Sequence, residues 1–234
     1  MARAMDFDYE SERTVNKKSI EDLPPKIKDV AYKFQKQGIQ YGIRKFGRML
    51  LGDEMGVGKT VQAIGMAYLY KNDWPLLIIT PASLKLTWRD ELLNWLPSLR
   101  PNNIQLFKKG SEPINLDCCI FIMSYDLASK RYIDIQQKEF KAIIADEAHY
   151  LKSRDAKRCK NLIPILQQAK RVILLSGTPI LNKPVEIYNL MKIIRPDVTP
   201  SFKEFTDRYC GPRMTPYGMD YSGATCTQEL HHLL

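Results

Sequence analysis

The chain has 234 residues, of which 44% are hydrophobic and 26% charged, values ordinary for a globular domain. It contains no run of about 18 apolar residues, which excludes a membrane-spanning helix of the usual kind, and its first 16 residues lack the apolar core of a secretory signal. A net charge of +9 favours a polyanionic partner, although many basic proteins have none.

The chain begins with a polar stretch. Residues 1–23 are rich in charge and are predicted to form an N-terminal extension that ends at the Pro24-Pro25 pair. From residue 26 to residue 43 the apolar residues recur at helical spacing, with breaks expected at Gly38 and Gly42.

The next predicted elements are a strand, a glycine-rich loop and a helix. The strand covers residues 49–51, and helical spacing resumes after Thr60 and ends near residue 72. This context favours a phosphate-binding loop. Gly56 and Gly58 would let backbone N–H groups approach phosphate oxygens, and the helix N-terminus adds partial positive charge.

The side chains of this loop suit phosphate and Mg²⁺ binding, but the loop departs from the strict pattern at one position. Lys59 would reach the β- and γ-phosphates of a nucleotide, and the Thr60 hydroxyl would be a ligand of Mg²⁺. The strict loop pattern has glycine where this chain has Asp53, and Asp53 and Glu54 are unexpected beside a polyphosphate. Taken alone, the loop is only suggestive, because a glycine-rich turn that binds no nucleotide can give a similar match.

Strands and helices alternate through the rest of the chain. This pattern predicts an α/β fold with a mostly parallel sheet and helices on both faces. The predicted strands cover 76–79, 104–107, 118–123, 142–145 and 172–175, and the predicted helices cover 84–96, with Ser83 as N-cap, 155–169 and 184–194.

Polar residues follow several of these strands, where ligands of such sheets bind. Asp146 could hold Mg²⁺, and Glu147 could orient and deprotonate an attacking water, although carboxylates at strand ends are often only helix N-caps. His149 could be an ordinary surface or core histidine, but its place two residues after Glu147 favours a coupling role. Together, the loop and the acidic pair predict nucleotide hydrolysis.

The motifs as a set resemble those of Snf2-type superfamily-2 ATPases. The matching segments are Phe34–Ile39, Gly52–Thr60, Thr80–Leu84, Ser124–Asp126, Asp146–His149 and Leu175–Asn182. The Asp-Glu-Met-Gly variant of the loop is a mark of that family, so the irregularity at Asp53 becomes support.

The resemblance implies a RecA-like first lobe over residues 24–210, followed at 211–234 by the start of an insertion that leads to a second lobe. It also implies roles for individual residues. Gln35 would read adenine, and the loop would bind ATP through Asp53, Glu54, Met55, Gly56, Val57, Gly58, Lys59 and Thr60. Thr60 and Asp146 would hold Mg²⁺, and the coupling residues would be His149, Ser176, Gly177 and Thr178.

DNA contacts are expected on the same side of the sheet. The candidates are Pro81, Ser83, Ser124 and Tyr125 at strand ends, and Lys152 and Arg154 in the basic run that follows the acidic pair. A basic run is often only a solvated helix face, and this alternative stays open. Trp88 is expected to be a core residue rather than a platform for bases.

Finer features, such as Asp146–Arg154 and Asp220–Gly223, resemble the annealing-helicase subgroup of the family. That resemblance implies a nuclear protein that moves on branched or forked DNA, or on junctions of single and double strands, and reanneals strands. A chromatin-remodelling ATPase and a nucleotide-binding module without turnover are the alternatives. An RNA helicase is disfavoured by the Ser-Gly-Thr sequence at 176–178. Because the second lobe would supply arginine side chains, the lobe alone is expected to bind nucleotide weakly and hydrolyse it poorly.

Overall fold

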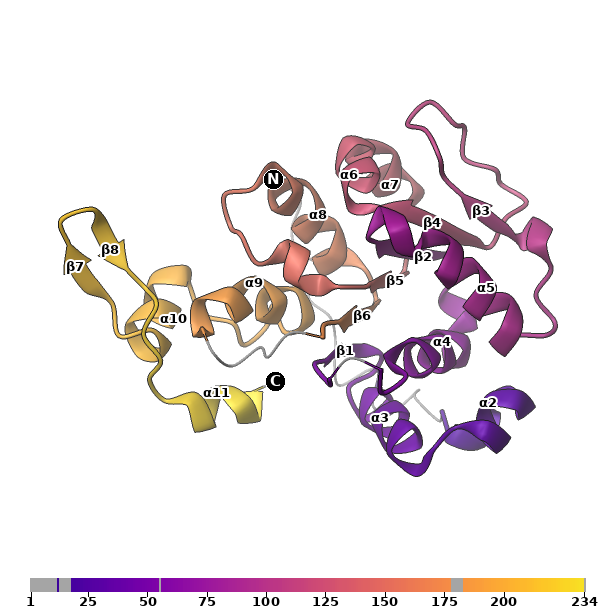
Figure 1. Cartoon of the computed structure of the whole chain (residues 1–234), viewed down its shortest axis with the longest axis horizontal. Coiled ribbons are helices and arrows are strands. Elements are labelled where there is room, and N and C mark those ends of the chain that lie inside the picture. Colours follow the sequence, from indigo (N-terminus) through magenta and orange to yellow (C-terminus); the bar gives the residue numbers. More distant parts are fainter. Residues whose placement is uncertain (1–11, 13–17, 55, 178–182, 234) are drawn as a thin grey trace.

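The computed structural model describes residue 12 and residues 18–54, 56–177 and 183–233. Its centre is a six-stranded sheet in the order β1-β6-β5-β2-β4-β3, and all of its neighbouring strands are parallel (Figure 1). The strands are β1 (Arg48–Leu51), β2 (Leu76–Thr80), β3 (Ile104–Leu106), β4 (Ile120–Ser124), β5 (Ala142–Ala145) and β6 (Arg171–Leu175). The predicted α/β fold with a parallel sheet is confirmed.

Helices cover both faces of the sheet (Figure 1). They are α2 (Pro25–Val30), α3 (Lys33–Arg44), α4 (Lys59–Leu69), α5 (Lys85–Trp95), α6 (Tyr125–Lys130), α7 (Tyr132–Lys138), α8 (Lys157–Gln168) and α9 (Pro184–Ile194). The expected helix at 184–194 is confirmed to the residue. Short 3₁₀ turns lie at Ile20–Asp22, Lys71–Asp73, Ala82–Leu84, Pro101–Asn103 and Ala148–Leu151.

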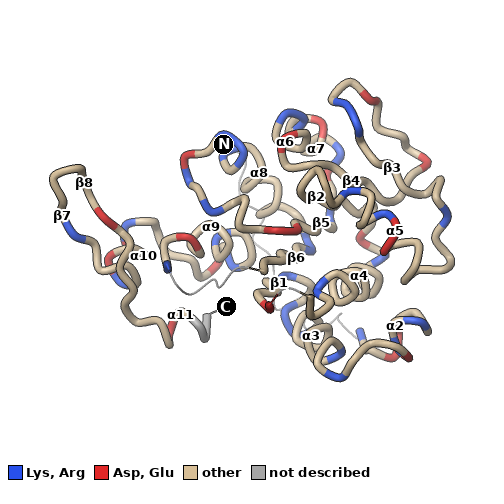
Figure 2. The backbone as a smooth tube through the Cα atoms, in the orientation of Figure 1, with Lys and Arg blue, Asp and Glu red and all other residues tan. Residues whose placement is uncertain are grey.

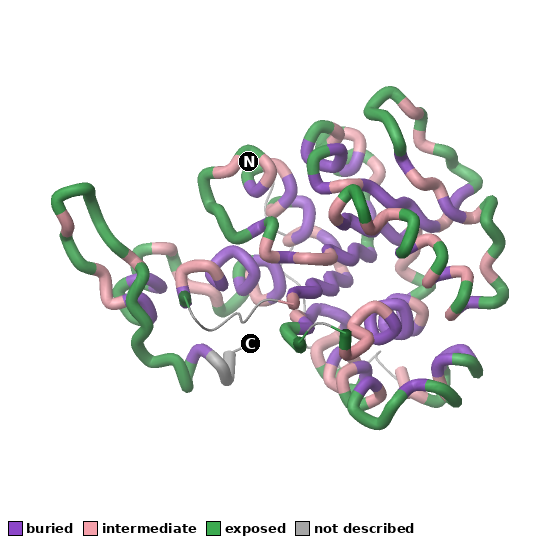
Figure 3. Tube along the Cα trace, in the orientation of Figure 1, coloured by how far each residue is buried: buried purple, intermediate pink, exposed green. Residues whose placement is uncertain are grey.

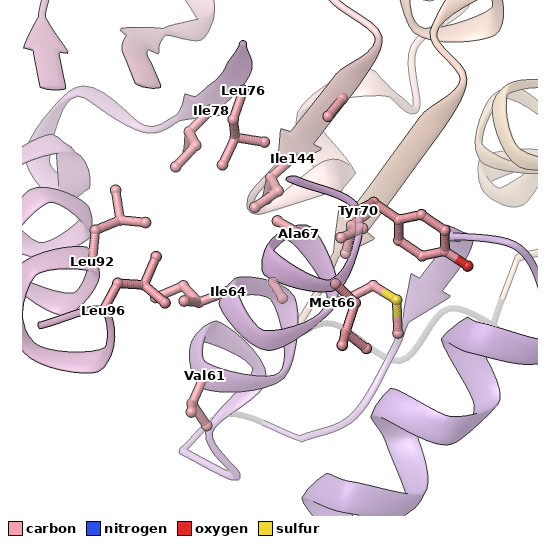
Figure 4. Packing of buried hydrophobic residues seen from close by; sticks show 14 of the residues in the cluster. Val61, Ile64, Met66, Ala67, Tyr70, Leu76, Ile78, Leu92, Leu96 and Ile144 are labelled. Carbon is pink, nitrogen blue, oxygen red and sulfur yellow. The ribbon is translucent and has the colours of Figure 1, made fainter. Parts of the chain in front are cut away.

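The two faces of the sheet bury two separate cores. Successive residues of a strand point to opposite faces; accordingly, Leu76 and Ile78 pack with α4 and α5, whereas Leu77 and Ile79 pack with the helices α6 to α9. Figure 4 shows the first core, in which Ile64 of α4 lies near Leu92 and Leu96 of α5. The strands β2, β5 and β6 are buried at every residue, as their continuous apolar runs predict, whereas the edge strand β3 is only partly buried (Figure 3).

The predicted breaks at Gly38 and Gly42 are wrong, because both glycines lie inside the continuous helix α3 and the chain breaks earlier, between α2 and α3. The glycines are needed for close packing. A Cβ atom at Gly38 would lie 1.9 Å from Oε1 of Gln62, and one at Gly42 would lie 2.4 Å from atoms of Met49 and Met66. The absence of side chains lets α3 approach α4 and β1.

The predicted N-cap at Ser83 is also wrong. Residues Ala82–Leu84 form a 3₁₀ turn, and α5 starts after it with Leu84 as its N-cap and no side-chain capping bond. The short helices α6 and α7 were not predicted.

A smaller C-terminal group of elements follows α9. It contains α10 (Phe202–Tyr209), the antiparallel hairpin of β7 (Arg213–Thr215) and β8 (Gly218–Asp220), and α11 (Thr227–Leu233). The hairpin extends away from the parallel sheet (Figure 1). Phe205 of α10 and Leu230 of α11 are fully buried in a third core with residues of α9. Among the described residues, no helix has the length and apolar character needed to cross a membrane.

Candidate nucleotide site

The loop after β1 turns through two glycines into the N-terminus of α4. Gly56 and Gly58 have φ angles of 84° and 78°, in the left-handed region that favours glycine. Gly58 also has no room for a side chain, since a Cβ atom would lie 2.2 Å from Nε2 of Gln35. The open backbone that the sequence predicts for this loop is therefore present. Met55, one of the predicted nucleotide contacts, lies outside the described residues.

Two side chains hold the loop in this shape. Nε2 of Gln35 donates a hydrogen bond of 3.1 Å to the carbonyl oxygen of Val57. Nζ of Lys59 donates bonds of 2.8 and 2.7 Å to the carbonyl oxygens of Asp53 and Glu54. Asp53 and Glu54 are exposed and contribute main-chain oxygens, so their carboxylates need not face a phosphate.

Asp146, the first residue after β5, has its carboxylate fixed by three donors. Oδ2 accepts hydrogen bonds from Oγ1 of Thr80, at 3.1 Å, and from Nε1 of Trp88, at 2.8 Å. Oδ1 accepts a bond of 2.9 Å from the backbone N–H of Glu147. Trp88 is buried, as expected, but its polar contact with Asp146 was not predicted, because nothing local in the sequence indicates it.

Glu147 and His149 form the other half of the acidic motif. Glu147 has a φ angle of 52°, which is unusual for a residue other than glycine. Its Oε2 atom lies 3.0 Å from Nδ1 of His149, close enough for an ion pair when the imidazole is protonated, although this nitrogen makes no hydrogen bond among the described residues. Strained backbone of this kind is concentrated at functional sites.

The loop and the acidic motif face a common pocket of about 440 Å³. The predicted site residues that line it are Gln35, Gly56, Gly58, Lys59, Thr60, Asp146 and Glu147. The remaining lining residues come from α2 to α5 and the turns beside them: Val30, Tyr32, Val61, Leu84, Thr87, Glu91 and Trp95. These groups fit a nucleotide with Mg²⁺. The backbone N–H groups of the glycine loop and the lysine suit phosphate oxygens, and the hydroxyl and the two carboxylates suit the ion.

The motif after β6 lies next to the start of the loop. Ser176 is 1% exposed, and its backbone N–H donates a bond of 3.0 Å to the carbonyl oxygen of Leu51. Gly177 follows at the surface of the same edge with intermediate exposure, and Thr178 lies outside the described residues. The structure therefore places the start of this predicted coupling motif beside the glycine loop.

The residues predicted to meet DNA differ in their exposure. Ser83 is exposed, Pro81 is half-buried, and Ser124 is the N-cap of α6, where its hydroxyl accepts a bond from the N–H of Leu127. Tyr125 is 2% exposed, so its ring is packed inside the protein, and contact of this strand end with DNA stays a prediction.

The two basic candidates are exposed and have protein partners. Nζ of Lys152 lies 3.3 Å from Oε1 of Glu186, and the guanidinium of Arg154 lies 4.2 Å from the ring centroid of Phe202. Lys and Arg residues are distributed over many elements rather than gathered in one block (Figure 2). Contact of Lys152 and Arg154 with DNA stays a prediction.

Comparison with known proteins places this geometry in context. The SNF2-related domain family matches residues 34–234. The "SWI/SNF-related matrix-associated actin-dependent regulator of chromatin subfamily A-like protein 1" of Bos taurus is 44% identical over 202 residues, which are 86% of this chain and 21% of that protein. The "DNA annealing helicase and endonuclease ZRANB3" of Bos taurus is 39% identical over 226 residues, or 93% of this chain and 21% of that protein. The chain therefore spans about a fifth of the length of these relatives.

A solved structure is similar in both fold and sequence. The Sulfolobus solfataricus SWI2/SNF2 ATPase core in complex with dsDNA matches with a TM-score of 0.71 and 28% sequence identity. The match covers 86% of this chain and 42% of the solved chain.

Proposed function

This chain belongs to the SNF2-related family, and we propose that it is the nucleotide-binding lobe of a DNA-dependent ATPase. The observation that carries the proposal is the pocket in which Lys59 and Thr60 of the loop meet Asp146 and Glu147 of the acidic motif. Phosphate binding and water activation need both sets of groups at one place.

The nucleotide that fits this site is ATP with Mg²⁺. Thr60 and Asp146 would hold the ion, which when bound neutralises charge that develops on the phosphates. Lys59, now bonded to two loop carbonyls, would exchange them for phosphate oxygens. Glu147 lines the same pocket and would orient a water molecule and accept its proton. Gln35, adjacent to the loop, would contact the adenine.

A second RecA-like lobe would complete the site. We propose that residues 24–210 are the first lobe and that residues 211–234 begin the insertion leading to the second. An arginine supplied from another domain can accelerate phosphoryl transfer by about 10³–10⁵-fold. The 234-residue chain alone should therefore bind ATP weakly and hydrolyse it poorly.

The proposed polymer substrate is DNA, and specifically branched or forked DNA with single- and double-strand junctions. One similar protein is named a DNA annealing helicase, and the solved ATPase core was in complex with dsDNA. The proposed activity is ATP-driven movement that reanneals strands or remodels forks, in the nucleus. Chromatin remodelling is the second candidate, because another relative is named a regulator of chromatin.

The experiment compares ATP turnover by the full-length protein with forked, duplex, single-stranded and nucleosomal DNA. We expect forked DNA to stimulate turnover most and Lys59→Ala to abolish it. Lys203→Ala, which removes an exposed lysine of α10, is the matched control and should leave turnover unchanged. Strongest stimulation by nucleosomes would favour the remodeller, and turnover that survives in Lys59→Ala would refute the proposed site.

The basic candidates are tested separately, by the salt dependence of DNA binding. Lysine and arginine side chains that hold phosphates release counterions, so replacing both Lys152 and Arg154 with alanine should flatten the slope of log affinity against log salt by about 2. An unchanged slope would identify them as a solvated surface.

A further inference from the structure

Tyr125 connects the strand end that is expected to face DNA with the acidic motif of the nucleotide pocket. It directly follows β4, in the strand-end segment expected to face DNA, and it is the first residue of α6. Its hydroxyl donates a hydrogen bond of 2.7 Å to the carbonyl oxygen of Asp146. Burial raises the pKa of Tyr125 well above its ordinary value, so the hydroxyl remains a donor throughout the usual pH range.

The Tyr125 ring is held in place by its neighbours. It stacks on Tyr150 with ring centroids 5.1 Å apart and an angle of 7° between the planes. The guanidinium of Arg158 lies 5.7 Å from the Tyr125 centroid and 5.0 Å from that of Tyr150. Arg158 also forms an ion pair of 2.9 Å with Asp126, the next residue of α6. The ring and the first turn of α6 are thus joined, and a shift of one would shift the other.

A second DNA-side segment reaches the other end of Asp146. Thr80 pairs with Ser124 in the register of β2 and β4, so the segments that follow these two residues are neighbours. Thr80 donates to the carboxylate of Asp146, whereas Tyr125 donates to its backbone carbonyl. Two strand ends on the expected DNA side therefore contact the same residue of the nucleotide pocket.

We propose that Tyr125 is a positioning residue, whose bond to the Asp146 backbone transmits DNA contact at the segment after β4 to the catalytic carboxylates. This inference rests on the proposed function, because it concerns how DNA stimulates turnover. It predicts that the hydroxyl matters more for stimulation by DNA than for the binding of either ligand.

The test compares Tyr125→Phe with Tyr150→Phe in the full-length protein. Both variants keep the stacked rings, but Tyr125→Phe removes the bond to Asp146, whereas Tyr150→Phe removes a hydroxyl from the more exposed ring, which is 38% exposed. Turnover is measured with and without forked DNA, and the affinities for DNA and for a fluorescent ATP analogue are measured alongside. We expect Tyr125→Phe to lower the stimulation factor about tenfold, the effect of one hydrogen bond, with DNA affinity within about twofold of wild type. Tyr150→Phe should keep full stimulation.

Unchanged stimulation by DNA in Tyr125→Phe would overturn the inference, and so would an equal loss of stimulation in Tyr125→Phe and Tyr150→Phe. An equal fall in turnover with and without DNA would also overturn it, because that result would indicate simple structural support. Should Tyr125→Phe fold poorly, Arg158→Gln provides an independent measurement, since it loosens the rings without removing the hydroxyl and should also lower stimulation. A wild-type protein that DNA does not stimulate would refute the proposed function itself, whereas normal stimulation of wild type and both tyrosine variants would refute only the role of Tyr125.

Discussion

The contacts between the buried side chain of Arg48 and the ends of two helices offer a quantitative test of what stabilises the fold. It is the first residue of β1, is 2% exposed, and donates hydrogen bonds to the carbonyl oxygens of Ala169, Ile193 and Ile194. These carbonyls lie at the C-terminal ends of α8 and α9, where a positive charge also meets the negative end of the helix dipole. Replacing Arg48 with methionine fills similar space but leaves three buried acceptors without that donor.

The expected destabilisation follows from these contacts. Loss of this donor costs about 1–3 kcal/mol at each carbonyl, and removal of a buried charge offsets part of the sum, so Arg48→Met should lower the free energy of unfolding by about 4 kcal/mol. For a domain of this size that corresponds to a fall of roughly 10 °C in melting temperature. Urea unfolding followed by tryptophan fluorescence measures the change.

The matched control is Arg44→Met, four residues earlier. Arg44 is exposed, with its guanidinium 5.9 Å from the ring centroid of Tyr41, so its loss should cost less than about 1 kcal/mol. Equal unfolding midpoints for the two variants would refute the reasoning, because desolvation of the buried guanidinium would then cancel its bonds to the helix ends.

Two further predictions concern the loop and the N-terminal extension. Gly58→Ala should weaken binding of a fluorescent ATP analogue about tenfold, since a left-handed alanine costs about 1–2 kcal/mol and its Cβ would displace Gln35; an unchanged Kd would contradict this. Glu12→Gln should lower stability by about 1–2 kcal/mol at pH 7, because Glu12 pairs with Lys170 and Arg171 at 2.7 and 2.9 Å. Burial raises the pKa of Glu12, but these partners outweigh it and hold that pKa below its ordinary value. The stability that the carboxylate contributes is present above its unfolded pKa of about 4.3 and is lost as the pH falls through the lower folded pKa. Thermal melts of wild type and Glu12→Gln should therefore converge in acid, and a difference that persists there would exclude the ion pairs as its cause.

The sheet could be predicted from the sequence because its signals are local. Continuous apolar runs such as 76–79 and 142–145 indicate strands buried on both faces, and both runs are strands here. The glycine loop and the acidic pair could likewise be placed at strand ends before their meeting in one pocket was known.

The remaining features depend on contacts between residues far apart in the chain. Trp88 and Asp146 are separated by 58 residues, and no local pattern indicates that the indole N–H of one binds the carboxylate of the other. The poor helix propensity of glycine predicts breaks at Gly38 and Gly42, whereas packing of α3 against α4 outweighs that propensity. Tyr125 was expected on the DNA side because of its position after β4, and only the fold reveals that its ring is buried.

The backbone of Glu147 offers a test that separates an ATPase from a module that only holds nucleotide. A left-handed conformation outside glycine costs about 1–2 kcal/mol, and Glu147 adopts it with φ at 52° while its side chain lines the pocket. Phe46 and Glu139 share this backbone conformation outside the pocket, so only measurement of turnover and stability together can tie the conformation of Glu147 to catalysis. Glu147→Gly should therefore abolish turnover and yet leave the melting temperature equal to that of wild type or higher. Glu147→Ala should abolish turnover equally but keep the strained Cβ, so its melting temperature should be lower than that of Glu147→Gly. If Glu147→Ala is more stable than Glu147→Gly, the left-handed backbone at Glu147 does not destabilise the protein, and the reasoning is refuted.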